Sequence, residues 1–315
     1  MKYAVISDIH GNYPALEQVL IDARNAGVGH YIFLGDYIFD LPFSNEVIDC
    51  ISSLDHADFI SGNKELYLKD LAGEDQTAWI SEQKGVLYQT YRELTDKTAA
   101  FISSLKETSY LTMESGLVIY ASHFIENSTG QARRQLGSGL FHEAMLEQPF
   151  CHKQFLDYFG QLINREDYRT VFRTIHAPVI LMGHNHLQGY GYSENQLVIN
   201  PGSCGQPLNF DNRASYTILE ENGSVLTVTE RRVSYDVEAV IAQAKKTRTY
   251  ACGRIWCELV FLALRTGKDY VDFFFDIARR IAGSKGEPDG IFFGNETWRE
   301  AYEQFTEQFL QHSKK

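Results

Sequence analysis

Short apolar runs alternate with amphipathic segments over the N-terminal part of the chain. Mainly apolar runs at residues 3–6, 31–34 and 58–60 have the length of buried strands. Residues 14–26 and 45–54 instead carry apolar side chains at helical spacing. Strands that alternate with helices in this way are typical of α/β layouts, in which the strands deliver loops to a common edge.

The pattern continues through the middle of the chain and changes near residue 236. Residues 65–105 and 141–175 are mainly helical in pattern, and residues 124–139 are predicted as a loop. Further strands are predicted at residues 117–121, 179–182, 197–199, 215–220 and 225–232. From residue 236 to 312 the pattern is helical, with a turn or linker at 283–290. We therefore predict a main domain over residues 1–235 and a helical C-terminal extension over 236–315.

Composition narrows the class of protein. Of the 315 residues, 44% are hydrophobic and 22% charged, which is ordinary for a globular protein. A net charge of -12 argues against a nucleic-acid-binding surface. The five cysteines form no CxxC pair, and no apolar run reaches the length of a membrane span. Because the first strand follows Met1 directly, we expect no signal peptide, and hence a cytoplasmic protein without nucleic-acid or membrane partners.

Polar residues that can bind metals follow most of the predicted strands. They are Asp8 and His10, Asp36, Asn63, His123, and His184 with His186. One such residue is commonly a buried or capping polar group, but a whole set after apolar strands indicates a shared site. Mixed imidazole and carboxylate ligands favour metals such as Mn, Fe, Zn or Co over Mg or Ca.

In their order along the chain, the motifs Asp-x-His, Gly-Asp, Gly-Asn, a lone His after a strand, and Gly-His-x-His resemble the calcineurin-like metallophosphoesterases. The resemblance runs from residue 8 to about 232. Residues 200–207 also resemble the bacterial phosphodiesterase branch, which includes diadenosine polyphosphate hydrolases. The resemblance to the calcineurin-like metallophosphoesterases implies an α/β (α+β) fold in which two mixed sheets form a sandwich flanked by helices. A binuclear metal site is expected on one rim.

The resemblance also implies a division of the ligands between two divalent or trivalent ions, with Mn, Fe or Zn expected. The first ion takes Asp8, His10 and His186, the second takes Asn63, His123 and His184, and Asp36 bridges the two. Two cations held together can clamp the attacking and leaving oxygens of a phosphate. We expect in-line attack by a metal-bound hydroxide, with Asp36, Asn63 and Lys64 as catalytic residues. Carbonyls of the turn at residues 200–203 are candidate acceptors for the imidazole N–H groups.

Lys64 marks a departure from the family, which normally has a histidine after Gly-Asn. Either Lys64 binds a phosphate oxygen, or it points to solvent while Glu65 starts a helix. An ammonium with an ordinary pKa near 10.4 shuttles protons poorly at neutral pH unless burial lowers that pKa. Substrates with good leaving groups are therefore favoured.

Other candidates for substrate binding, besides Lys64, come from the loops. Arg133, Arg134 and Arg213 could meet a phosphate chain, the alternative being solvated loop positions. Tyr37 and Phe39 either stack on a base or belong to the core. The Gly35-Asp36-Tyr37 stretch lacks the Asp-Arg-Gly continuation of protein phosphatases.

We therefore expect a phosphodiesterase acting on a small nucleotide-like phosphoester, with a dinucleoside polyphosphate as one candidate. A phosphomonoesterase or protein phosphatase is the alternative within this class. A catalytically weak metal-binding scaffold or sensor is the alternative from another class. The helices after residue 236 are predicted to form either a cap over the site or the interface of a homo-oligomer.

Overall fold

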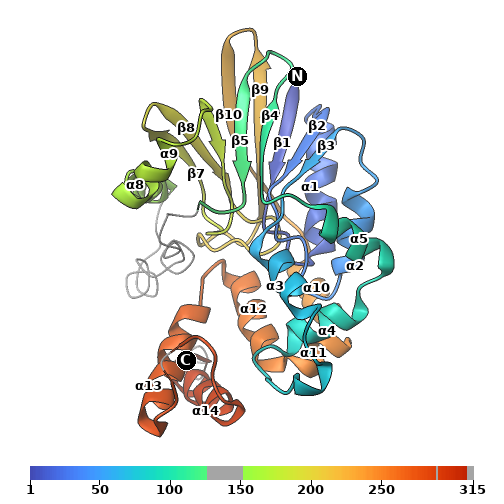
Figure 1. The fold of residues 1–315 in the computed structure, drawn as a ribbon, viewed down its shortest axis with the longest axis vertical. Coiled ribbons are helices and arrows are strands. Elements are labelled where there is room, and N and C mark those ends of the chain that lie inside the picture. The colour runs from blue at the N-terminus through green and yellow to red at the C-terminus, as the bar shows by residue number, and fades with distance from the viewer. Residues whose placement is uncertain (126–151, 289, 311–315) are drawn as a thin grey trace.

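Two mixed five-stranded sheets pack face to face in the computed structural model, which describes residues 1–125, 152–288 and 290–310 (Figure 1). The strand order is β10-β9-β1-β2-β3 in the first sheet and β4-β5-β6-β8-β7 in the second. The first-sheet strands are β1 (Lys2–Ile6), β2 (His30–Phe33), β3 (Ala57–Phe59), β9 (Ala214–Asn222) and β10 (Val225–Val233). The second-sheet strands are β4 (Thr108–Thr112), β5 (Val118–Ser122), β6 (Val179–Leu181), β7 (Gln188–Ser193) and β8 (Gln196–Pro201). The predicted sandwich of two mixed sheets is confirmed.

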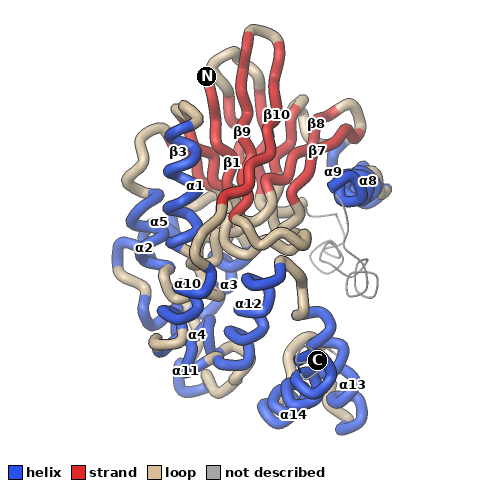
Figure 2. The backbone as a smooth tube through the Cα atoms, turned by 180° about the vertical axis from the view of Figure 1, so that it is seen from behind, coloured by secondary structure: helices blue, strands red, loops and turns tan. Residues whose placement is uncertain are grey.

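Some helices flank the sandwich and others lie below its strands (Figure 2). Those of the main domain are α1 (Tyr13–Asn25), α2 (Ser44–Ile51), α3 (Asn63–Leu71), the 3-10 turn η1 (Gln76–Ala78), α4 (Gly85–Glu93), α5 (Asp96–Ser104), α8 (His152–Ile163) and α9 (Glu166–Phe172). Those of the C-terminal region are α10 (Val237–Ala244), α11 (Arg248–Cys252), α12 (Arg254–Thr266), α13 (Val271–Lys285), α14 (Asn295–Phe305) and the π-helical turn η2 (Thr306–Leu310).

Strand β1 is buried on both faces, which explains its uninterrupted apolar sequence. Val5 faces the second sheet and packs in one cluster with Leu181. Ile6 faces the helical layer and packs in another cluster with Leu16 of α1. β1, β2 and β3 run parallel, as do β5, β6 and β8, so the carboxyl ends within each set meet at one edge.

Two edge strands, β4 and β7, were not predicted from the sequence. β4 carries mostly polar residues that alternate between half-buried and exposed, and β7 contains two glycines. At Gly189 of β7 an added Cβ would lie 2.9 Å from the ring of Phe159, so glycine is needed for α8 to pack there. Both strands sit at the ends of the second sheet, where the hydrophobic pattern is weak.

The turn predicted at residues 283–290 begins later in the structure. α13 continues through Gly283 and ends at Lys285, where Gly286 adopts a left-handed φ of 70° and its N–H reaches the carbonyl of Ala282. Glycine at this capping position explains why the helix stops there and not three residues earlier. The predicted loop at 124–139 and the start of the helix predicted from residue 141 lie mainly outside the described residues.

The C-terminal helices use two different cores. Val240 of α10 and Phe261 of α12 pack in the cluster that also contains Leu16. The other side of α12 joins α13 and α14 in an aromatic cluster that includes Phe274 and Trp298. α12 therefore connects the outlying helices to the main domain (Figure 1). Among the described residues, no helix is long and apolar enough to cross a membrane.

Candidate metal centre

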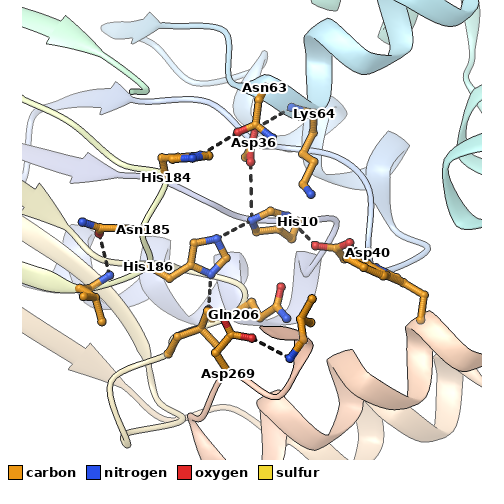
Figure 3. A pocket seen from close by; sticks show the side chains of 14 residues that line it. His10, Asp36, Asp40, Asn63, Lys64, His184, Asn185, His186, Gln206 and Asp269 are labelled. Carbon is orange, nitrogen blue, oxygen red and sulfur yellow. Dashed lines mark hydrogen bonds and ion pairs between the residues drawn. The ribbon is translucent and has the colours of Figure 1, made fainter. Parts of the chain in front are cut away.

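The structure brings all seven predicted metal ligands together at one rim of the sandwich. Figure 3 labels His10, Asp36, Asn63, His184 and His186. Asp8 and His10 follow β1, Asp36 follows β2, and Asn63 opens α3 just after β3. His123 follows β5, and His184 and His186 follow β6. The parallel strands thus deliver their polar ends to one place.

Asp8, His10 and His186 form the first group. The Nε2 atoms of His10 and His186 lie 3.0 Å apart, and Asp8 Oδ1 lies 3.3 Å from His186 Nε2. Asp8 is fully buried, yet its Oδ1 atom accepts no hydrogen bond. A buried carboxylate oxygen without a donor is unstable, and a cation among these three atoms would supply the missing partner. The first group therefore fits a metal ion.

The second group centres on Asn63. Its Oδ1 atom lies 3.1 Å from His123 Nε2 and 2.9 Å from His184 Nδ1. Asp36 Oδ2 faces both groups, because it lies 3.4 Å from His123 Nε2 and 3.8 Å from His10 Nε2. This is the position that the predicted bridging role requires. Imidazole, carboxylate and amide donors together suit borderline divalent metals.

Five of the seven ligands have left-handed backbone conformations. They are Asp8, His10, Asp36, His184 and His186, with φ between 53° and 73°. For residues other than glycine this region is sparsely populated and costs on the order of 1–3 kcal/mol each. Backbone hydrogen bonds hold two of these turns, from Asp8 N to Gly35 O and from His10 N to Asp36 O. Strain concentrated in this way is typical of functional sites.

Acceptors from three different loops hold the imidazoles. His10 Nδ1 lies 2.8 Å from Asp40 Oδ2. His123 Nδ1 lies 2.7 Å from the carbonyl of Leu34, and His186 Nδ1 lies 2.6 Å from that of Gln206. Because the Nδ1 atoms are engaged in this way, the Nε2 atoms face the metal position.

The prediction that carbonyls at residues 200–203 accept from the imidazoles was wrong. This turn supports the site from behind, because Ser203 Oγ donates to the carbonyl of Asp8 at 2.6 Å and accepts from Gln206 N at 2.7 Å. The turn packs under the β1 loop. The acceptor of His186, the carbonyl of Gln206, lies three residues after this turn.

Asp40 is the residue that sequence reasoning missed. It is buried, and its Oδ1 atom accepts a hydrogen bond from Trp256 Nε1 at 2.7 Å while its Oδ2 faces His10. The only signal in the sequence is a second aspartate four residues after Asp36. Asp40 therefore links Trp256 of helix α12 to His10, a candidate metal ligand.

Glu65 organises the backbone beneath Asp36. Its carboxylate accepts from Asp36 N and Tyr37 N at 2.9 Å each and from Gly62 N at 2.7 Å. Burial, followed by the neighbouring Asp36 carboxylate, raises the pKa of Glu65 to about 7. Glu65 thus lies in the first turn of α3 and also joins the Gly-Asp and Gly-Asn loops through these hydrogen bonds.

Lys64 points into the site, so its solvent-facing alternative was wrong (Figure 3). Its Nζ atom lies 4.7 Å from the ring centroid of Phe39, 5.8 Å from that of Tyr67 and 5.9 Å from that of Trp256. Burial opposes the charge, but Asp40 and Asp36 outweigh it and raise the pKa of Lys64. Lys64 is therefore an ammonium at neutral pH.

The carboxylates also set the charge of the imidazoles. Burial opposes protonation of His10, but Asp40, Asp8 and Asp36 raise its pKa to about 10. Asp36 and Asp8 likewise overcome burial at His123 and raise its pKa to about 9. Burial and the neighbouring His123 lower the pKa of His184 to about 4.

A cleft of about 180 Å³, which we name the metal-site cleft, opens over these groups. Among its lining residues are His10, Asp36, Asp40, Asn63, Lys64, His184, His186, Gln206, Trp256 and Asp269. Arg213 is not one of them, and its guanidinium instead pairs with Asp211 at 2.6 Å. Arg133 and Arg134 lie outside the described residues. Tyr37 belongs to the core, where its hydroxyl donates to the carbonyl of Ile60.

Comparison with known proteins agrees with this geometry. Residues 1–224 match the model of the calcineurin-like phosphoesterase superfamily domain. The chain belongs to this superfamily. Its members depend on metal ions, so the Asp and His groups described above are those expected of a calcineurin-like phosphoesterase. The resemblance inferred from the motifs is confirmed.

Individual calcineurin-like relatives are distant. An uncharacterized protein of Methanocaldococcus jannaschii is 26% identical over 262 residues, which cover 78% of this chain and 92% of that protein. A metallophosphoesterase from Sphaerobacter thermophilus superposes with a TM-score of 0.60 at 21% identity, over 85% of this chain and 99% of that one. A hypothetical protein from Pyrococcus horikoshii OT3 gives 0.61 at 17% identity, with the same coverage. These likenesses show that the fold is shared.

Proposed function

We propose that the protein is a metal-dependent phosphodiesterase acting on a nucleotide-like substrate, with a dinucleoside polyphosphate as one candidate. The observation that carries the proposal is the pair of converging ligand groups around the buried Asp8 Oδ1, which accepts no hydrogen bond, at a cleft that also presents the Lys64 ammonium. Membership of the calcineurin-like superfamily supports hydrolysis of phosphoesters.

The ligand groups and Lys64 divide the work. A pair of bound metal ions would supply Lewis-acid chemistry, by polarising the phosphoryl group and lowering the pKa of water. Asp36 is placed to hold the two ligand groups in register, since its Oδ1 accepts from Lys64 N at 2.8 Å and its Oδ2 faces both groups. Lys64 can bind a phosphoryl oxygen as a point charge.

The raised pKa of Lys64 argues against a role as proton donor to the leaving group. Without such a donor, substrates whose leaving group departs as a stable anion are favoured. A polyphosphate chain or an activated ester satisfies this condition, whereas a simple alkoxide does not. This reasoning supports an anhydride-containing or activated diester over a phosphorylated serine or threonine side chain.

The test is turnover by Mn-loaded protein of bis-p-nitrophenyl phosphate, p-nitrophenyl phosphate and diadenosine tetraphosphate. We expect the diester and the dinucleotide to be hydrolysed with higher kcat/KM than the monoester. Preference for the monoester would favour a phosphomonoesterase. Two bound metals with no turnover of any substrate would favour the scaffold or sensor and contradict our proposal.

The role of Lys64 is tested with phosphodiesters of graded leaving-group pKa. We expect a steeper dependence of kcat/KM on that pKa in the natural protein than in Lys64→His, because the histidine can donate a proton. Lys97→His is the matched control, since Lys97 is exposed and pairs with Asp49 away from the metal-site cleft. Equal slopes for the natural protein and Lys64→His would show that Lys64 does not determine leaving-group preference.

A further inference from the structure

A second cavity of about 380 Å³ adjoins the metal-site cleft, and we name it the aromatic cavity. Lys64 and Trp256 line both spaces, so the two adjoin at these side chains. The aromatic cavity lies between α3, α4, α12, α13 and residues 291–292. Its volume falls within the roughly 300–1,000 Å³ typical of small-molecule sites.

Aromatic rings from separate elements dominate this cavity. Tyr67 comes from α3, Phe275 from α13, and Phe292 from the loop before α14. Tyr67 is 45% exposed and Phe292 is 62% exposed. Large aromatic side chains left exposed around a concavity are typical of ligand-binding surfaces, because their faces offer area at little entropic cost.

Two ammonium groups, of Lys64 and Lys84, and two carboxylates, of Asp70 and Glu74, accompany the rings. Lys64 lies at the junction with the metal-site cleft, and Lys84 Nζ lies 4.5 Å from the ring centroid of Phe292. Positive charge on an aromatic wall suits a ligand that combines a flat ring system with anionic groups. A neutral alkyl chain would contact the rings but would make no use of either ammonium group. A second protein chain would meet a cavity and not a flat patch.

We propose that the aromatic cavity is the subsite for the base of a nucleotide-like substrate. In this arrangement Lys64 contacts the phosphate at the junction, and the base stacks among Tyr67, Phe275 and Phe292. The inference rests on the proposed function, because it assumes that a phosphate occupies the metal-site cleft. It adds that recognition comes from the base, through side chains of the C-terminal helical region as well as α3.

Equilibrium binding to the Mn-loaded protein tests the subsite without requiring turnover. The probes are adenosine 5′-monophosphate, ribose 5-phosphate, which lacks the base, and octyl phosphate, which carries an apolar chain. Stacking of one base on aromatic side chains is worth roughly five- to hundredfold in affinity. We expect the adenosine nucleotide to bind about tenfold more tightly than either of the other probes.

Variants at the exposed rings locate the effect. In the double variant Tyr67→Ala, Phe292→Ala the preference for the nucleotide over ribose 5-phosphate should fall to within about twofold, with ribose 5-phosphate affinity unchanged. Tyr192→Ala is the matched control, because Tyr192 is 69% exposed on β7 and lines neither space. It should keep the full preference.

Three results would overturn the subsite. They are equal affinity for the nucleotide and ribose 5-phosphate, octyl phosphate binding as tightly as the nucleotide, or an equal loss for all probes in the double variant. Failure of the proposed function appears separately, as absent turnover of every phosphoester by the natural protein. A protein that prefers the nucleotide but hydrolyses nothing would retain the subsite and refute only the enzymatic proposal.

Discussion

Replacing Asp40 with asparagine tests whether a residue that holds a metal-binding histidine affects the affinity for metal. In the natural protein each carboxylate oxygen has its own contact: Oδ1 accepts a hydrogen bond from Trp256 Nε1 at 2.7 Å, and Oδ2 forms an ion pair with His10 Nδ1 at 2.8 Å. An asparagine keeps one acceptor oxygen and places an N–H₂ group where the other oxygen was. Whichever way the amide turns, either Trp256 or His10 loses its contact with a carboxylate oxygen.

The size of the effect follows from this lost contact. A hydrogen bond to a charged group contributes about 1.5–3 kcal/mol. That range corresponds to roughly ten- to a hundredfold in metal affinity, which matches the usual effect of changing a residue that holds a metal-binding histidine.

The loss should be confined to one ion. Competition with a chromogenic chelator should show the first site, with Asp8, His10 and His186, weakened by at least tenfold. The second site, with Asn63, His123 and His184, should change by less than about threefold, because Asp40 contacts none of its ligands.

Asp22→Asn is the matched control for Asp40→Asn. Asp22 also pairs with a cation and accepts from an aromatic side chain, through Arg231 at 2.7 Å and Tyr216 at 2.6 Å. It lies on α1, outside the metal-site cleft. Unchanged affinity of both sites in Asp40→Asn, with the fold intact by circular dichroism, would refute the reasoning.

Three further predictions concern the loaded and unloaded site. Because the carboxylates hold the pKa of His10 at about 10 and that of His123 at about 9, both are protonated in the metal-free protein at neutral pH. Metal binding should release about two protons, so affinity should rise with pH from 6 to 8, and a flat calorimetric profile would contradict this. Removing metal with a chelator should lower the unfolding midpoint, by about 2.7 kcal/mol of stability if the metal was present at a hundred times Kd; an unchanged midpoint after verified removal would argue against a metal-stabilised site. Gly205→Ala should destabilise the protein by roughly 1–3 kcal/mol in urea, because its Cβ would lie 1.8 Å from the carbonyl of Ile9, whereas Gly73→Ala meets no atom within 4 Å; equal midpoints for the two variants would disprove the steric argument.

The parts predictable from the sequence are those governed by short-range patterns. Apolar runs located β1, β2, β5 and β6, and the polar residues after them marked the candidate metal ligands, because a strand end and its loop are adjacent in sequence. The ordered motifs identified the superfamily for the same reason. Edge strands β4 and β7 were missed, since their burial depends on neighbours that the local pattern does not reveal.

The environment of each ligand was decided by tertiary packing. Asp40 became the partner of His10 because α12 brings Trp256 to it from 216 positions away in the sequence. The sequence left open whether Lys64 faces the site or solvent. In the structure its ammonium lies near the rings of Phe39, Tyr67 and Trp256, because α3, the β2 loop and α12 converge there. The sequence by itself determined which residues are candidates to bind metal and phosphate, since these are residue types with suitable donor atoms at strand ends. Only the tertiary structure decided their charges, their orientation and the neighbouring aromatic cavity, because each depends on loops that meet only when the sheets and the C-terminal helices pack together.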